Sequence, residues 1–195
     1  MQPMANIALR AARKAADFIL LSFDRPDQLR IEEKTSKDFV SNIDKRAEEI
    51  IVEQIQTTYP THNILAEESG TTQVDKSNEY TWIVDPIDGT LNFIRGIPHF
   101  AVSIGIQKGR HLEHGVIVDP INREEYVASR GYGATLNGKK IRVSSSESLQ
   151  DGLVSAGIAP SNINQRLESY IKNLQEFTRA CQAIRSTGSA ALDLA

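Results

Sequence analysis

Residues 82–90 read Trp82-Ile83-Val84-Asp85-Pro86-Ile87-Asp88-Gly89-Thr90. This run begins as a strand of β-forming residues and becomes acidic at Asp85 and Asp88. Fifteen residues before Trp82 stands the pair Glu67-Glu68, directly after a second expected strand at residues 63–66. Four carboxylates near the ends of two strands repel one another unless their pKa values rise or cations lie among them.

A hard divalent cation such as Mg²⁺ is the usual partner of such a carboxylate group, because it takes oxygen ligands and dehydrates reluctantly. Pro86 fixes the backbone after Asp85. A tight turn there would let Asp85, the carbonyl of Ile87 and Asp88 converge, with Glu67 reaching the same volume from the other strand. Two Mg²⁺ ions roughly 3.5–4 Å apart could then share Asp85.

The residues after Asp88 predict a phosphate beside the metals. Gly89-Thr90 is expected to open a short helix through residue 93, and the backbone N–H groups at a helix start bind anions. Gly89 would allow a phosphate to approach the backbone closely. One ion could lower the pKa of a bound water, and the other could stabilise the leaving alkoxide. Hydrolysis of a phosphate monoester, one of the slowest uncatalysed reactions, suits such a site.

Each pattern also has an ordinary structural interpretation. A Glu-Glu pair alone is typical of a solvated surface, and an Asp-Pro-x-Asp-Gly string alone is typical of a turn. Only their combination with two strand ends and a helix start favours a functional site.

Hydrophobic periodicity predicts two helices followed by a sheet. The expected helices cover residues 4–23 and 43–58, and residues 34–41 and 70–78 are expected to be polar loops. Strands are expected at residues 29–33, 63–66, 80–84, 100–107, 112–118, 125–128, 134–136 and 139–143. The predicted architecture is a pair of N-terminal helices on an antiparallel sheet.

A change of pattern near Ser144–Glu147 predicts a boundary between residues 1–146, which carry the metal site, and residues 147–195. The second part reads as strand 153–158, helix 163–181, strand 183–185 and a helix after Ser189, and so as the start of an α/β layer. Ser189 is a suitable N-cap and Asp193 suits the first turn. No C-cap signal follows, so we expect that the sequence stops early and that this layer is truncated.

Composition sets further bounds on function. The 195 residues are 40% hydrophobic and 24% charged, which suits a packed core. A net charge of −3 gives no direct signal for nucleic acid. No run approaches 18 apolar residues, so no membrane partner is expected. The single cysteine, Cys181, cannot form an internal disulfide, which predicts a cytoplasmic protein.

The motifs together resemble the inositol monophosphatase family of metal-dependent, lithium-inhibited phosphatases. The resemblance rests on Glu67-Glu68, Asp85-Pro86-Ile87-Asp88-Gly89-Thr90, Asn92-Phe93, the run from Pro98 to Ile104, and Gly188-Ser189. It implies an α-β-α-β-α layered sugar-phosphatase fold. It also implies Mg²⁺-dependent hydrolysis of inositol monophosphate or a similar polyol or sugar monophosphate. A nucleotidase acting on 3′,5′-bisphosphates is an alternative.

The resemblance also implies roles for individual residues. Two or three Mg²⁺ ions would be held by Glu67, Asp85, the Ile87 carbonyl and Asp88. Catalysis would use Glu67 and Thr90 to orient water, with Asp44 supporting Thr90. Substrate would meet Asp88, Gly89, Thr90, Gly188, Ser189 and Ala190. Lys34 and Glu68 would lie on loops near the metals, although Lys34 could equally be a solvated lysine and Asp44 a charge that favours a helix start.

The resemblance implies partners as well. Family members are commonly homodimers, and a bacterial branch is associated with transcription antitermination. Contact with RNA polymerase or a Nus factor is therefore expected, and a regulatory binding module is the alternative to an enzyme. The family also takes a further metal aspartate from a position downstream of residue 195. A chain ending at residue 195 would therefore lack one metal ligand, and its phosphatase activity would be in doubt.

Overall fold

The computed structural model describes residues 2–35, 38–75, 77–157 and 163–195, although the side chains of residues 33–35, 38 and 163–165 fall outside the description. The helices are α1 (Pro3–Phe23), α2 (Asn42–Thr58), α3 (Thr90–Ile94), α4 (Ile163–Ala180) and α5 (Ala190–Leu194), with 3₁₀ turns at Pro26–Gln28 and Leu149–Asp151. The strands are β1 (Ile31–Thr35), β2 (Asp38–Ser41), β3 (Asn63–Ala66), β4 (Gly70–Thr72), β5 (Tyr80–Asp88), β6 (Ala101–Lys108), β7 (His111–Asp119), β8 (Glu124–Ser129), β9 (Gly133–Leu136), β10 (Lys139–Ile141), β11 (Leu153–Ser155) and β12 (Ala183–Arg185).

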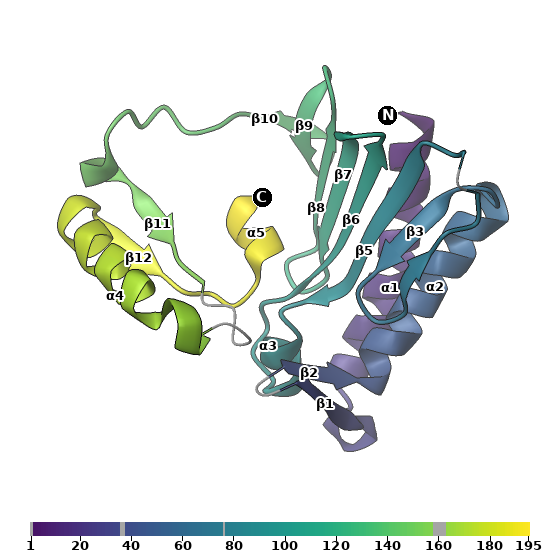
Figure 1. The fold of residues 1–195 in the computed structure, drawn as a ribbon, viewed down its shortest axis with the longest axis horizontal. Helices are drawn as coiled ribbons and strands as arrows, with labels where there is room; N and C mark the ends of the chain where they lie inside the picture. The colour runs from purple at the N-terminus through teal and green to yellow at the C-terminus, as the bar shows by residue number, and fades with distance from the viewer. Residues whose placement is uncertain (1, 36–37, 76, 158–162) are drawn as a thin grey trace.

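The main layer is an eight-stranded sheet in the order β10-β9-β8-β7-β6-β5-β3-β4. Helices α1 and α2 cover one face of it (Figure 1). Small alanines line the buried side of α1, and isoleucines at positions 51 and 55 line that of α2. The largest fully buried side chains are Trp82, Phe93 and Phe100, which pack with these helices in one apolar core. The predicted pair of helices on a sheet is confirmed.

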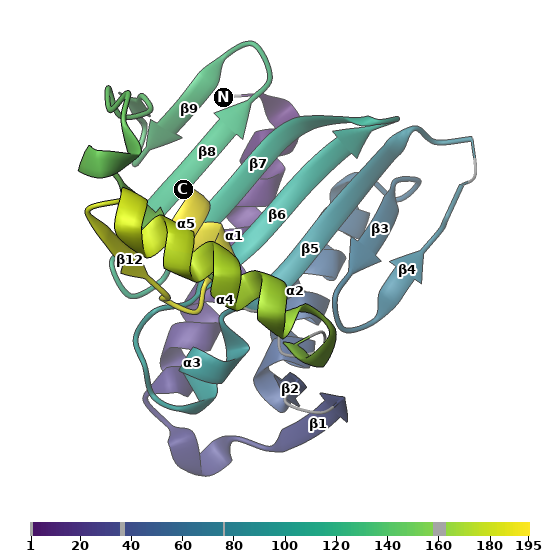
Figure 2. The same cartoon turned by 60° about the vertical axis from the view of Figure 1, so that its left-hand side comes forward.

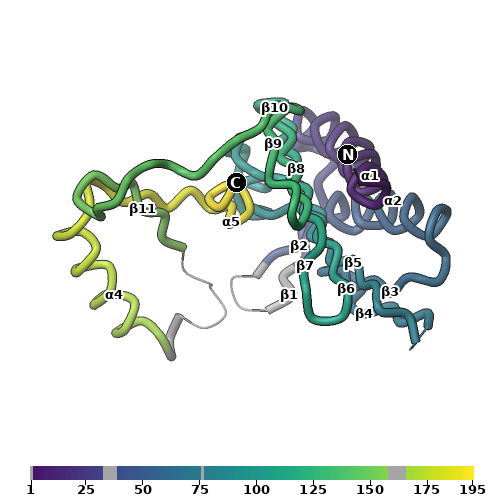
Figure 3. Tube along the Cα trace, turned by 90° about the horizontal axis from the view of Figure 1, so that it is seen from above, coloured from purple at the N-terminus to yellow at the C-terminus, as the bar shows by residue number. Residues whose placement is uncertain are grey.

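A smaller layer lies on the opposite side of the sheet. Strands β11 and β12 pair in parallel and α4 packs beside them. Seen from above, α5 lies between this layer and the main sheet (Figure 3), and it contacts β6 and β7. Figure 2 shows α4 on the viewer's side of the sheet and α1 behind it. The extended residues 142–148 connect the two layers, and the predicted boundary at 146/147 falls within them.

The sheet differs from the prediction in one important pairing. Strand β3 pairs with β5 in parallel, whereas the other neighbouring strands of the sheet are antiparallel. The reason is β4, which lies within the segment expected to be a loop at residues 70–78. The chain turns back from β3 into β4 at the sheet edge and then crosses to enter β5 in the direction of β3.

Three other boundaries also differ. Within the segment 34–41, expected to be a polar loop, residues 34 and 35 belong to β1 and residues 38–41 to β2, and the two strands pair antiparallel. Strand β5 continues to Asp88 instead of ending at Val84, because its pairing with β6 persists through the acidic residues. Strand β11 ends at Ser155, and Ile158 of the strand predicted for residues 153–158 lies outside the described residues.

The search for membrane-crossing helices gave a negative result. Within the described ranges, no helix combines the length and the apolar character that a bilayer span requires.

An aromatic stack closes the end of the core that lies away from the acidic residues. The His62 ring stacks between Tyr59 and Tyr80, with centroid distances of 4.7 and 5.0 Å. The indole N–H of the fully buried Trp82 donates to His62 Nδ1 over 3.0 Å. Lys108 lies 5.4 Å from the Tyr80 ring centroid and faces Glu79. Burial lowers the pKa of His62, so the ring is held as a neutral acceptor.

We expect this stack to make stability fall on acidification. Unfolded His62 binds a proton near pH 6.5, whereas folded His62 does so only at lower pH. Its contribution is therefore complete above pH 6.5 and is lost as the pH falls through the folded pKa. Urea unfolding, followed by fluorescence of Trp82, should show a positive slope of the unfolding free energy with pH below 6.5.

The variant His62→Phe keeps a ring between the two tyrosines and should flatten that slope. His111→Phe, at an exposed histidine, should leave it unchanged. A residual slope from His114 is expected, because burial lowers its pKa too. An unaltered slope in His62→Phe would rule out this origin of the acid sensitivity.

Candidate functional site

Parallel pairing of β3 and β5 brings two acidic residues to one sheet edge. Ala66 pairs with Val84, and the Glu67 N–H continues the ladder by donating to the Val84 carbonyl over 3.1 Å. Glu67 and Asp85, the next residue of each strand, therefore lie side by side. An antiparallel pair would have put these two strand ends at opposite edges.

A β-bulge then reshapes β5 between Asp85 and Asp88. Asp85 pairs with Ser103 and Asp88 with Ala101, so β5 has one more residue than β6 over this interval. Bulges bend a strand and redirect its side chains. A bulged strand, and not the expected tight turn, therefore connects Asp85 to Asp88.

The electrostatics show that four carboxyl groups gather here. The pKa of Asp85 is raised to about 9, chiefly by burial and then by the charge of Glu67 and a hydrogen bond with it. The charges of Asp88 and Asp44 add to the rise. Asp85 Oδ1 is buried and makes no hydrogen bond with the described residues. A cation would lower that pKa and satisfy the orphaned oxygen.

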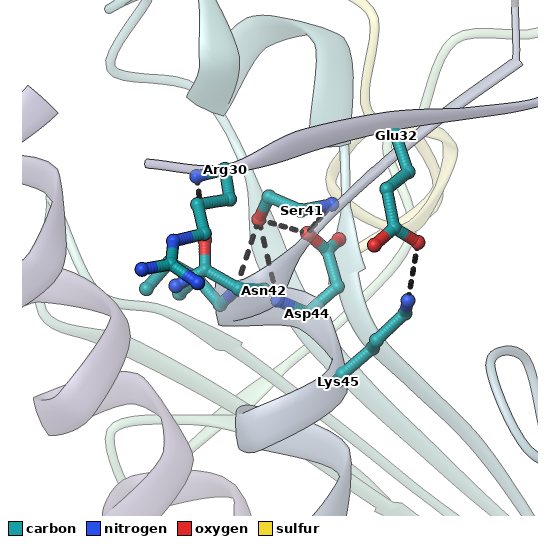
Figure 4. Close-up of polar contacts among 7 residues, drawn as sticks. Arg30, Glu32, Ser41, Asn42, Asp44 and Lys45 are labelled. Carbon is teal, nitrogen blue, oxygen red and sulfur yellow. Dashed lines mark hydrogen bonds and ion pairs between the residues drawn. The ribbon is translucent and has the colours of Figure 1, made fainter. Parts of the chain in front are cut away.

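Asp44 reaches the site from the first turn of α2. Its carboxylate accepts hydrogen bonds from the backbone N–H (2.9 Å) and the hydroxyl (2.5 Å) of Ser41 (Figure 4). The Ser41 oxygen accepts in return from the Asp44 N–H, and the two bonds from backbone N–H groups form a capping box. Its other oxygen lies 3.0 Å from the Thr90 hydroxyl. Burial raises the pKa of Asp44, and the hydrogen bonds from Ser41 and Thr90 oppose the rise. The two interpretations of Asp44 are therefore compatible, because it caps α2 and contacts Thr90.

The β1–β2 hairpin is attached to the same helix start. The Arg30 N–H donates to the Asn42 side chain over 2.8 Å, and Lys45 pairs with Glu32 at 2.5 Å (Figure 4). Lys34, which we expected on a loop, belongs to β1, while its side chain lies outside the described residues. The positions of Lys34 and Glu68 near the metals remain predictions.

The Asp88 carboxylate faces the C-terminal layer. Its Oδ2 accepts hydrogen bonds from the Ser189 hydroxyl (2.5 Å) and from the Ala191 backbone N–H (2.8 Å). Ser189 is fully buried and is also the N-cap of α5, as the sequence predicted. Gly188, Ser189 and Ala190 line a cavity of about 530 Å³ together with Asp88, Ser155 and Asp193. The structure therefore brings together these predicted substrate residues.

Two functional candidates were missed by the sequence analysis. Glu48, only 4% exposed, accepts hydrogen bonds from the N–H groups of Glu68 (2.7 Å) and Ser69 (2.9 Å) and so fixes the turn after Glu67. The sequence feature that could have indicated Glu48 is an acidic residue on the apolar face of α2, one turn after Asp44. Asn92 was noted only as part of a motif, yet its side-chain amide donates to the carbonyls of His99 and Thr187.

The donor set fits a hard cation. No three His, Cys, Asp or Glu side chains in the described ranges are already arranged to hold a metal ion, and Asp88 is turned toward α5. Yet Asp85 has a buried oxygen without a hydrogen bond and a raised pKa, and the charges of Glu67 and Asp88 lie nearby. Mg²⁺, which prefers oxygen ligands, would bind that oxygen and neutralise those charges.

This fold, with its acidic strand ends, places the protein in the class of layered α/β sugar phosphatases. The chain belongs to the inositol monophosphatase family, whose model matches residues 1–195. It is 46% identical over 198 residues to Nus factor SuhB of Pseudomonas aeruginosa, covering all of this chain and 73% of the relative.

Solved structures give the same result. The extragenic suppressor protein suhB of Bartonella henselae superposes with a TM-score of 0.94 at 35% identity, over 99% of this chain and 73% of the other. The inositol monophosphatase of Anabaena gives a TM-score of 0.83 at 33% identity, over 98% and 69% of the two chains. The resemblance inferred from the motifs and the predicted fold class are confirmed.

Proposed function

We propose that this protein is a Mg²⁺-dependent phosphatase of inositol monophosphate or a similar polyol or sugar monophosphate. The observation that carries the proposal is the acidic cluster around the orphaned Asp85 oxygen, next to the start of α3. Glu67, Asp85, Asp88 and the Ile87 carbonyl would hold two or three Mg²⁺ ions. When bound, Mg²⁺ would activate a water molecule and stabilise the leaving oxygen.

The protein groups orient that water. The Thr90 hydroxyl lies 3.0 Å from Asp44 Oδ1 and 2.9 Å from the Ile87 carbonyl, and it can donate its single proton to only one of them at a time. Its oxygen can then accept a hydrogen bond from water while Glu67 accepts another. The N–H groups of Gly89 and Thr90, at the start of α3, would hold the phosphate. Gly188, Ser189 and Ala190 would bound the sugar side.

The lining of the cavity supports a substrate with one phosphate. Its described lining residues are the acids Asp88 and Asp193, three serines, Leu194 and small Gly and Ala residues, with no Lys or Arg among them. Hydroxyl, backbone and carboxylate groups suit the alcohols of a polyol, whereas a second phosphate would meet the like charge of Asp193 and no cationic side chain among these residues. The 3′,5′-bisphosphate alternative is accordingly less favoured.

Phosphate release from purified protein tests the proposal. We expect release from inositol 1-phosphate that requires Mg²⁺, is inhibited by Li⁺ and exceeds release from adenosine 3′,5′-bisphosphate at least tenfold. The asparagine variant Asp88→Asn should be inactive. Equal rates with and without Mg²⁺, or full activity in that variant, would refute the proposal.

The name Nus factor, carried by relatives 44–46% identical, supports a second role in a transcription antitermination complex. Pull-down of RNA polymerase and Nus factors by wild type and by Asp88→Asn separates the two roles. Binding by both would show a regulatory function independent of catalysis. Binding by neither would exclude that role.

A further inference from the structure

We propose that Ser189 is a positioning residue for Asp88, and that residues 187–191 form a latch that couples Mg²⁺ binding at Asp88 to docking of the C-terminal layer. This inference rests on the metal site of the proposed function. In this proposal the Ser189 hydroxyl binds the Asp88 carboxylate, and the Ser189 backbone lines the cavity.

The first contact of the latch is made to the metal-site carboxylate. Ser189 is fully buried, and its hydroxyl donates to Asp88 Oδ2 while it accepts from the Leu192 N–H at 3.4 Å. The Ala191 N–H donates to the same Asp88 oxygen. Two donors on Oδ2 fix the plane of the carboxylate and leave Oδ1 for another partner. This is how protein groups behind a metal ligand usually orient it.

The second contact holds the preceding turn against α3. The Asn92 amide donates to the Thr187 carbonyl over 2.9 Å. Gly188 has φ +92°, and a Cβ there would lie 2.7 Å from Asn92 Nδ2. The Gly188 carbonyl in turn lies 3.3 Å from the position of a Cβ on Gly89. The turn therefore packs tightly against Gly89, which follows Asp88, and against Asn92 of α3.

The third contact ties the latch to the smaller layer. The carboxylate of Asp193, within α5, accepts hydrogen bonds from the hydroxyls of Thr187 and of Ser155 on β11. A movement of β11 and β12 would therefore be transmitted through α5 to Asp88. Binding that fixes Asp88 must, by linkage, favour the docked position of α5 to the same extent.

Magnesium affinity measured by calorimetry tests the coupling without any turnover. Loss of an outer partner of a metal ligand weakens binding roughly 10–100-fold, so Ser189→Ala should raise the dissociation constant by about tenfold or more. Ser189→Thr keeps the hydroxyl and should restore it. The matched control is Ser169→Ala on the exposed face of α4. Equal affinity in Ser189→Ala and wild type would overturn the proposal, as would failure of Ser189→Thr to restore it.

Two metal-free measurements separate the latch from the proposed function. A double-mutant cycle of Ser189→Ala with Asp88→Asn should show coupling of about tenfold in the unfolding equilibrium constant, since the hydrogen bond has a charged acceptor. In wild type, amide exchange at Ala191 should be slow and should slow further with Mg²⁺. If the two substitutions are coupled in the metal-free protein but wild type binds no Mg²⁺, the metal site is rejected and the contact between Ser189 and Asp88 is kept. Additive variants and a rapidly exchanging Ala191 amide would reject the latch itself, even where a variant folds poorly.

Discussion

Asp85→Asn is expected to remove Mg²⁺-dependent phosphate release almost completely, by about three orders of magnitude or more, because a shared metal ligand contributes several kcal/mol to a two-metal site. The same change should affect the metal-free protein little. Burial and the charge of Glu67 raise the pKa of Asp85 to about 9, so the side chain is already neutral at pH 7, and asparagine reproduces its shape and its hydrogen bond.

Thermal unfolding with and without Mg²⁺ distinguishes this result from simple misfolding. Wild type should gain about 2.7 kcal/mol at a Mg²⁺ concentration 100 times the dissociation constant, which is roughly 5–10 °C for a chain of this size. Asp85→Asn should gain almost nothing. Asp24→Asn, at an exposed aspartate after α1, should behave as wild type. Retained stabilisation by Mg²⁺ in Asp85→Asn would exclude Asp85 as a ligand.

The parts of this site that the sequence predicted are those encoded locally. Glu67 and Asp85 follow runs of β-forming residues, and such a run that ends in an acid is visible without any tertiary information. Ser189 was recognisable as an N-cap, because capping depends on the few residues that follow it. The helices α1 and α2 were predicted to within one residue at each end for the same reason.

The parts that could not be predicted depend on pairing between distant segments. The three-residue strand β4 has little signal of its own, and without it the parallel direction of β3 and β5 is not determined. The bond from Ser189 to Asp88 joins residues 101 positions apart. The role of Glu48 was hidden because its partners are backbone N–H groups, whose position depends on the folded turn after Glu67.

Gly89 combines local and distant constraints, and its substitution should destabilise the protein strongly. Its φ is +101°, a region in which an L-residue costs roughly 1–2 kcal/mol. A Cβ would also lie 3.1 Å from the His99 carbonyl oxygen and 3.3 Å from that of Gly188. Both neighbours are backbone atoms that cannot rotate away, so overpacking adds about 1–3 kcal/mol. Gly89→Ala should therefore destabilise the protein by about 3 kcal/mol.

Gly131→Ala is the matched control, because φ is +78° there and no atom lies within 4 Å of the added methyl group. It should cost only the conformational part, about 1 kcal/mol, and leave phosphate release intact. In Gly89→Ala the backbone shift is passed directly to Asp88 and Thr90, so phosphate release should fall about 100-fold even in molecules that remain folded. Urea unfolding of both variants and rates per folded molecule measure the two effects. Equal destabilisation by the two substitutions would show that the close approach of the His99 and Gly188 carbonyls imposes no constraint at Gly89.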